Sequence, residues 1–419
     1  MTEINAREPV SRYAAAMAIR SIARPGASQP APPPDATASF ALFNLGFRPF
    51  YFVAATYAAL SIPLWLLVWA GLVPMRVSFA TQWWHTHEMV FGFALAVVIG
   101  FLLTAARAWT GIDTPNGNRL VGLVALWLGA RIFFHAGLIV AGVVIELVLI
   151  VLAASAILRV LVVAGNRRNL FVVLILAVLG AMDIAFALAA GGWIAWSPDA
   201  PLRAALYLIV MLTAVFGGRV IPSFTANALM GIRQFQRSWL DAAAIVAAIA
   251  ALLADLVFAG GVVVALLAGI AALAHALRLA GWNPLATRHK PILWILHAAY
   301  AWMPIGFALL ACSALGLVAR PLALHAFAVG LIGGLIIGMI TRTALGHTGR
   351  PLAAGGSETA MYLLVMLAAL TRVVGPLLLP AQTLHFYVIS GIAWAGAFAV
   401  YAIVYWPRLS QPRIDGRPG

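Results

Sequence analysis

Cysteine and acidic residues are scarce in this 419-residue sequence, and charge of either sign is rare. The single cysteine, Cys312, excludes an intrachain disulfide, a CxxC redox motif and a cysteine-ligated iron–sulfur cluster. Charged residues make up 9% of the chain, whereas soluble domains carry roughly 25%. This composition excludes an ordinary soluble domain.

Long apolar runs take the place of the missing charge. Hydrophobic residues account for 64% of the chain and the mean hydropathy is +1.01. Because about 20 apolar residues cross a bilayer as a helix, the sequence predicts an all-α, polytopic membrane protein that has the lipid bilayer as its surroundings. Twelve spans are predicted near 49–70, 84–106, 119–138, 141–163, 170–191, 202–225, 239–258, 261–280, 291–316, 321–345, 358–379 and 384–406.

The two ends of the chain differ from this pattern. Residues 1–40 are basic and rich in proline, and they have no apolar core like that of a signal peptide. We therefore expect a disordered cytoplasmic tail over 1–40, a transmembrane domain over 41–407 and a short cytoplasmic tail over 408–419.

Arginine placement predicts the orientation. With twelve spans, twenty of the 26 basic residues fall in the N-terminal tail, the even-numbered loops and the C-terminus, and four fall on the other side. Basic residues gather on the cytoplasmic side of membrane proteins, so both termini are expected there. The same bias explains the net charge of +14 without a nucleic-acid partner.

The motif Trp83-Trp84-His85-Thr86-His87-Glu88-Met89 opens the second span and is the strongest functional signal. Ionisable groups at the edge of hydrocarbon are costly to bury, and imidazole and thioether suit haem iron and copper. On a regular helix His85 and His87 point about 200° apart, while His85, Glu88 and Met89 share a face. The two imidazoles can therefore serve one metal only if the helix begins after them. The alternative is a histidine that merely caps the helix at the interface.

The nine histidines separate into two levels of the bilayer. One metal cannot take ligands from both, because the levels are roughly 20 Å apart in a core of about 30 Å. The predicted ligands at the outer level are His85, His87 and His325, and those at the inner level are His275, His297 and His347. Each could instead be a structural core histidine; His135, His289 and His385 are better read as interfacial or loop residues.

Three arginines are candidate anchors for an anionic group such as a haem propionate. Arg342 and Arg350 flank His347, and Arg219 lies between Gly217-Gly218 and Pro222, where we expect a close approach and a bent helix. The alternatives are that the first two only satisfy the cytoplasmic charge bias, and that Arg219 reaches out to the interface. Glu88 is the corresponding acidic candidate.

Four segments together resemble the NnrS family: Phe47-Arg48-Pro49-Phe50, the Trp84–Gly92 motif, Gly218-Arg-Val-Ile-Pro-Ser-Phe-Thr and Thr341-Arg-Thr-Ala-Leu-Gly-His-Thr-Gly-Arg-Pro. The resemblance extends from about Phe43 to Pro407. It implies a multi-pass protein of the bacterial inner membrane that binds haem and copper and is involved in the response to nitric oxide, in denitrification and nitrosative stress.

Three functions compete at this point. The first is a haem- and copper-binding protein that binds or disposes of nitric oxide; if it is an enzyme, it is a metal-dependent oxidoreductase. The second is a haem–copper oxidase or nitric oxide reductase, which is disfavoured because neither His-His nor His-Pro-Glu occurs. The third is a transporter for a metal, haem or small anion, which predicts a broken helix at mid-membrane, with Gly217–Pro222 as the candidate.

Overall fold

The structure, a computed structural model, describes residues 40–74 and 80–417. The predicted tail before Phe40 lies outside the described residues. Every regular element in the described ranges is a helix. Twelve helical segments there are long and apolar enough to cross a membrane, which confirms the predicted all-α, twelve-span fold. The cytoplasmic location of the two termini stays a prediction.

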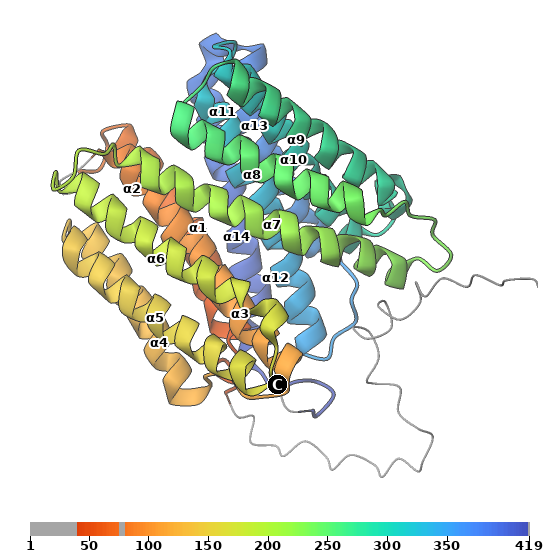
Figure 1. The fold of residues 1–419 in the computed structure, drawn as a ribbon. Helices are drawn as coiled ribbons and strands as arrows, with labels where there is room; N and C mark the ends of the chain where they lie inside the picture. Colours follow the sequence, from red (N-terminus) through yellow and green to blue (C-terminus); the bar gives the residue numbers. More distant parts are fainter. Residues whose placement is uncertain (1–39, 75–79, 418–419) are drawn as a thin grey trace, which may run out of the picture. The chain divides into compact units, whose positions relative to one another are not determined.

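The twelve segments follow the predicted spans in order (Figure 1). The first six are α1 (Phe47–Trp69), α2–η1–α3 (Thr81–His87, Glu88–Ala94, Leu95–Thr110), α4 (Gly117–His135), α5 (Ile139–Val163), η2–α6 (Arg167–Asn169, Phe171–Ala190) and α7 (Asp199–Ala228). The last six are α8 (Ser238–Phe258), α9 (Val262–Gly281), α10 (Pro291–Ala314), α11–η4–α12 (Arg320–His325, Ala326–Gly333, Gly334–His347), α13 (Gly356–Leu378) and η5–α14 (Pro380–Gln382, Thr383–Ser410). A short 3₁₀ turn, η3 (Pro284–Thr287), precedes α10.

Two pairs of neighbouring helices form hairpins around glycine turns. α4 packs against α5 after Gly137, and α8 packs against α9 after Gly260 and Gly261. All three glycines have a positive φ, which a residue with a Cβ rarely adopts. In Figure 1 the two hairpins lie on opposite sides of the remaining helices.

The second and tenth spans occupy the centre of the bundle. The most apolar window of Thr81–Thr110 is 83% buried and that of Arg320–His347 is 72% buried, against 28–56% for the other ten spans. These two spans carry the outer-level histidines predicted as ligands. Side chains on them are therefore shielded from lipid on nearly every face.

Both central spans widen into a π-helix close to a histidine. η1 begins at Glu88, three residues after His85, and η4 begins at Ala326, directly after His325. A π-helix replaces i→i+4 bonds by i→i+5 bonds and is found mostly at functional sites. The widened turns thus direct attention to the space between these two spans.

Candidate metal-binding pocket

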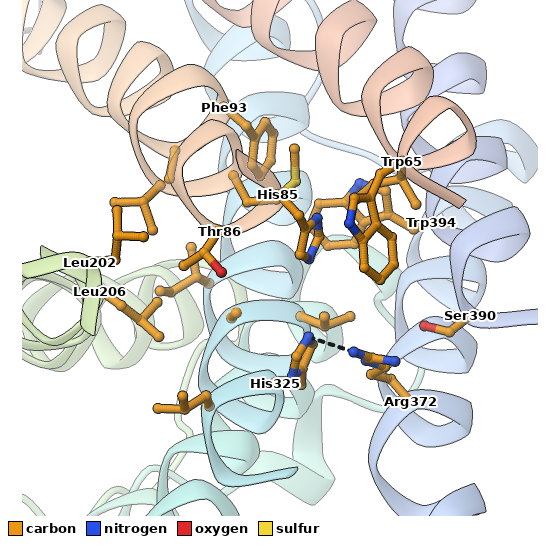
Figure 2. A pocket seen from close by; sticks show the side chains of 18 of the residues that line it. Trp65, His85, Thr86, Phe93, Leu202, Leu206, His325, Arg372, Ser390 and Trp394 are labelled. Carbon is orange, nitrogen blue, oxygen red and sulfur yellow. Dashed lines mark hydrogen bonds between the residues drawn. The ribbon is translucent and has the colours of Figure 1, made fainter. Parts of the chain in front are cut away.

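A cavity of about 150 Å³ lies between the two central spans and their neighbours. Its walls come from α1, α2, η1, α7, α11, η4, α13 and α14, and they are largely apolar and aromatic (Figure 2). Polar groups enter at a few points only, chiefly His85, His325 and Arg372. An apolar cavity with a few convergent polar groups is the usual form of a ligand site.

His85 and His325 face each other across this cavity. Their ring centroids are 6.4 Å apart and the ring planes differ by 10°. Trp65 stacks on His85 at 4.3 Å and holds the imidazole in place. The Nδ1 atom of His85 is buried and has no hydrogen-bond partner, so this ring has coordination capacity that the protein does not use.

The surroundings of His325 fix its tautomer. Nδ1 lies 2.7 Å from the carbonyl oxygen of Pro321, to which its N–H donates a hydrogen bond. Nε2 is then an acceptor, and it receives a hydrogen bond of 3.0 Å from Arg372, drawn as a dashed line in Figure 2. The guanidinium of Arg372 lies 3.5 Å from the ring centroid of Tyr387. The lone pair of Nε2 is thus occupied by the guanidinium of Arg372, which also lines the cavity.

Met89 lines the cavity with His85, as the shared helical face predicts. Glu88 does not. We expected its carboxylate beside His85, but it contacts the neighbouring imidazole, with Oε1 2.9 Å from Nδ1 of His87. The reason is that the chain widens into η1 at Glu88: in the wider turn the i+3 position, Glu88, rotates off the face of His85, whereas the i+4 position, Met89, stays on it.

His87 points away from the cavity that His85 lines. Its Nε2 atom lies 3.0 Å from Oδ1 of Asp183 on α6. The helix has already begun at Thr81, which is the condition under which the two imidazoles of the motif were expected to face different neighbours. The two histidines of the motif therefore belong to two separate sites, His85 to the cavity and His87 to the contact with Asp183.

The inner-level histidines occupy separate positions. Nδ1 of His275 lies 2.8 Å from the hydroxyl of Tyr300, and Nε2 of His297 lies 2.8 Å from Oγ1 of Thr225. In each ring the other nitrogen is buried without a hydrogen-bond partner. Among the described residues, His275, His297 and His347 do not form a group of three ligands around one point.

The candidate anchors near the inner level have protein partners of their own. Arg342 lies 3.9 Å from the ring centroid of Phe224. Arg413 donates to the backbone carbonyl of His347 at 2.9 Å, and the Nη1 atom of Arg350 is buried without a partner. Arg350 therefore has a buried donor left over for an anionic group.

The Gly217-Gly218 step does permit a close approach. A Cβ added to Gly218 would lie 1.8 Å from a guanidinium nitrogen of Arg278, and one added to Gly217 would lie 3.3 Å from the ring of Tyr300. Arg219 is exposed, which fits a side chain reaching out to the interface. α7 stays helical through Pro222 to Ala228, so the broken helix that a transporter site would need is not found at this position.

Arg372 was missed as a site residue. A signal for it was available, since it is one of the four basic residues that fall on the side opposite the arginine-rich side. Two of the other three, Arg203 and Arg320, pair with the buried carboxylate of Asp255 at 3.6 and 3.4 Å. Arginines that depart from the cytoplasmic bias thus mark buried polar contacts in this protein.

The fold and the pocket together define a class: a multi-pass helical membrane protein with histidines from two central spans facing each other in an apolar cavity. Within that class, the chain belongs to the NnrS family, since the family model described as NnrS protein matches residues 41–413. Membership of this family supports a nitric oxide-related membrane protein. A comparison with curated proteins found no match.

Proposed function

We propose that this protein binds copper and haem in the bacterial inner membrane and takes part in the response to nitric oxide, binding or disposing of the gas and relieving nitrosative stress. The observation that carries the proposal is the pair of facing imidazoles, His85 and His325, in an apolar cavity. Nitric oxide is small and apolar, so it can reach such a cavity through the lipid. When bound, the metal supplies a coordination position that the gas can occupy.

Copper fits the pocket once Arg372 turns away from Nε2 of His325. Two imidazoles and the thioether of Met89 are ligands that copper accepts. Metal–nitrogen bonds of about 2.0–2.1 Å place the centroids of two ligating rings about 6 Å apart, close to the 6.4 Å between His85 and His325. Arg372 would release Nε2 of His325 on binding and keep its place over Tyr387.

Haem fits the chemistry of the lining, but a cavity of about 150 Å³ requires wall side chains to move before a porphyrin can enter. Outside this pocket, His275 and His297 each have a buried ring nitrogen without a partner, and either of them would be available to hold a haem iron. These assignments rest on ring nitrogen atoms that have no hydrogen-bond partner. Replacing each histidine singly tests which of them holds the haem iron.

The test is metal content and optical spectrum of the purified protein. We expect His85→Ala and His325→Ala to weaken copper binding strongly. The loss should exceed the roughly 10–100-fold that follows when a residue that only hydrogen-bonds a metal ligand is removed. His385→Ala, an exposed histidine, is the control and should retain the metal. A Soret band that shifts when nitric oxide is added supports the haem assignment.

Retention of full copper and haem by both pocket variants would refute the pocket assignment. A colourless protein without copper would instead favour the transporter function.

A further inference from the structure

A second group of ionisable side chains is buried on the other side of the second span. His87 and Glu88 stand at the junction of α2 and η1, Arg131 on α4, Glu146 on α5 and Asp183 on α6. All five are at most 2% exposed. Ionisable groups this deep in a membrane domain are costly to bury and need partners of opposite charge.

His87 is at the centre of this group. Nδ1 lies 2.9 Å from Oε1 of Glu88, while Nε2 lies 3.0 Å from Oδ1 of Asp183 and 4.0 Å from Oε2 of Glu146. If Nδ1 carries the proton and donates it to Glu88, the lone pair of Nε2 faces two carboxylates. A positive charge is then needed between these atoms.

Aromatic rings close the space around the imidazole. Phe91, Phe134 and Phe186 lie with ring centroids 5.0, 4.1 and 5.0 Å from that of His87. Water therefore has little access, and the charges must be balanced inside the protein.

The protein's own charges do not balance. Arg131 is the one cation that is permanently charged, and its guanidinium donates to Glu88 at 3.1 Å and to Glu146. The group holds three carboxylates and one guanidinium, so with all three carboxylates ionised even a protonated His87 leaves one negative charge. In agreement, Oε1 of Glu146 and Oδ2 of Asp183 are buried without hydrogen-bond partners.

We propose that His87, Glu146 and Asp183 bind a divalent first-row metal ion, separate from the copper pocket. Their ligand atoms all lie within 4.8 Å of one another, and metal bonds of about 2.0–2.2 Å hold ligand atoms about 3–4.4 Å apart. One imidazole with two carboxylates is a ligand set for Zn²⁺, Mn²⁺ or Fe²⁺. With a neutral His87, the ion and Arg131 balance the three carboxylates.

Glu88 completes the arrangement from behind. A metal-bound imidazole usually donates its other N–H to a carboxylate, which fixes the tautomer and the ring orientation. Glu88 accepts from Nδ1 of His87 in this way, and it is itself held by Arg131 and by the hydroxyl of Tyr57. The ion joins α2, α5 and α6, so it holds the α4–α6 helices to the central span.

The experiment uses the full-length protein in detergent, treated with a chelator and then given Zn²⁺ alone or, in a parallel sample, Mn²⁺ alone, in both the wild-type and the His85→Ala background. Asp183→Asn is the main variant because the hydrogen bond of Asp183 is made to His87, and the variant leaves the Arg131 contacts intact. We expect it to bind about one Zn²⁺ fewer per chain, or to bind it at least tenfold more weakly. Glu146→Gln, which keeps an oxygen acceptor for Arg131, should behave in the same way.

Asp255→Asn is the matched control, since Asp255 is equally buried but pairs with Arg203, Arg320 and Tyr207. It should bind Zn²⁺ as the unmodified chain does. Zn²⁺ should also raise the melting temperature of the wild type and not that of Asp183→Asn. Unchanged Zn²⁺ binding by Asp183→Asn would overturn the proposal, and so would a chelator-treated wild type that takes up neither Zn²⁺ nor Mn²⁺.

Discussion

Arg131 determines whether the charged cluster of His87, Glu88, Glu146 and Asp183 can exist in a membrane domain. Its Nη1 atom lies 3.1 Å from both carboxylate oxygens of Glu88, and Nη2 contacts Glu146. Removing one partner of a buried ion pair is far more destabilising than removing both, because the remaining charge is left without compensation.

Replacing Arg131 should therefore destabilise the fold strongly. We expect Arg131→Met to lower the free energy of unfolding by about 3–5 kcal/mol, measured by chemical unfolding in detergent micelles. Arg219→Met, at an exposed intramembrane arginine, should change it little. Adding Glu146→Gln to Arg131→Met should recover part of the loss, and a further loss in the double variant would contradict this account.

At the scale of single residues, the sequence indicates many of the residues that form each site. It does not indicate which of these residues contact one another. Glu146, Asp183 and Asp255 lie within predicted spans, and none has a partner nearby in sequence. Their partners lie on other spans, such as His87 for Asp183, 96 positions away. Only tertiary packing brings such pairs together, so spacing along one helix could not reveal them.

At the scale of elements, close packing of η4 against α10 fixes where His325 stands. A Cβ added to Gly330 in η4 would lie 2.2 Å from Cγ of Trp302 on α10, a distance at which something must shift. Cγ is at the rigid base of the indole, so the strain must be taken up by the helices themselves.

Gly330→Ala should therefore lower the stability by about 1–3 kcal/mol, the usual cost of overpacking, and weaken copper binding through displacement of His325. Gly269→Ala in α9 is the matched control, because a Cβ there meets nothing within 4 Å. An alanine in a helical position with open space around its Cβ should leave stability unchanged or raise it by about 0.4–1 kcal/mol. Thermal unfolding of both variants, with copper titration, tests the pair; equal melting temperatures would contradict the packing argument.

Hydropathy predicted the twelve spans because bilayer thickness sets the length of an apolar run. It could not predict η1 and η4, since a π-helix and an α-helix of the same residues are equally apolar. This is why Met89 lies beside His85 and Glu88 does not: in the wider turn of η1 the i+4 position stays on the face of His85 and the i+3 position leaves it. Local backbone bonding, and not composition, separates the two side chains.

At the scale of the whole molecule, the arginine bias gives a directional prediction. Twenty basic residues on one side against four on the other place both termini in the cytoplasm. The same orientation places the cavity near the outer leaflet. It also places Ser197, in the loop between α6 and α7, on the periplasmic side of the membrane.

Labelling with a membrane-impermeant maleimide tests the orientation, and the single native cysteine makes the experiment simple. In a Cys312→Ala background, Ser197→Cys should react in intact cells and Gln411→Cys only after permeabilisation. Both positions are exposed. The opposite pattern would invert the topology and move the cavity to the cytoplasmic half of the bilayer.

The pairing of spans that are distant in sequence was beyond prediction. The two levels of histidines were predicted from span direction, and His85 and His325 were both placed at the outer level. That these two rings would face each other depends on the second and tenth spans both occupying the centre. A hydropathy profile predicts the length and direction of each helix. It does not predict which helices pack against each other.

The widened turns in the two central spans also affect how relatives of this chain should be compared. Each π-helix acts as an inserted residue, and one residue rotates the preceding half of a helix by about 100° relative to the following half. A relative that lacks such an insertion would present its outer-half histidine to a different neighbour, even with every ligand residue retained. Alignments of relatives should therefore permit a single-residue gap inside these spans. Such alignments will show which relatives keep both histidines facing the pocket better than identity at the ligand positions alone.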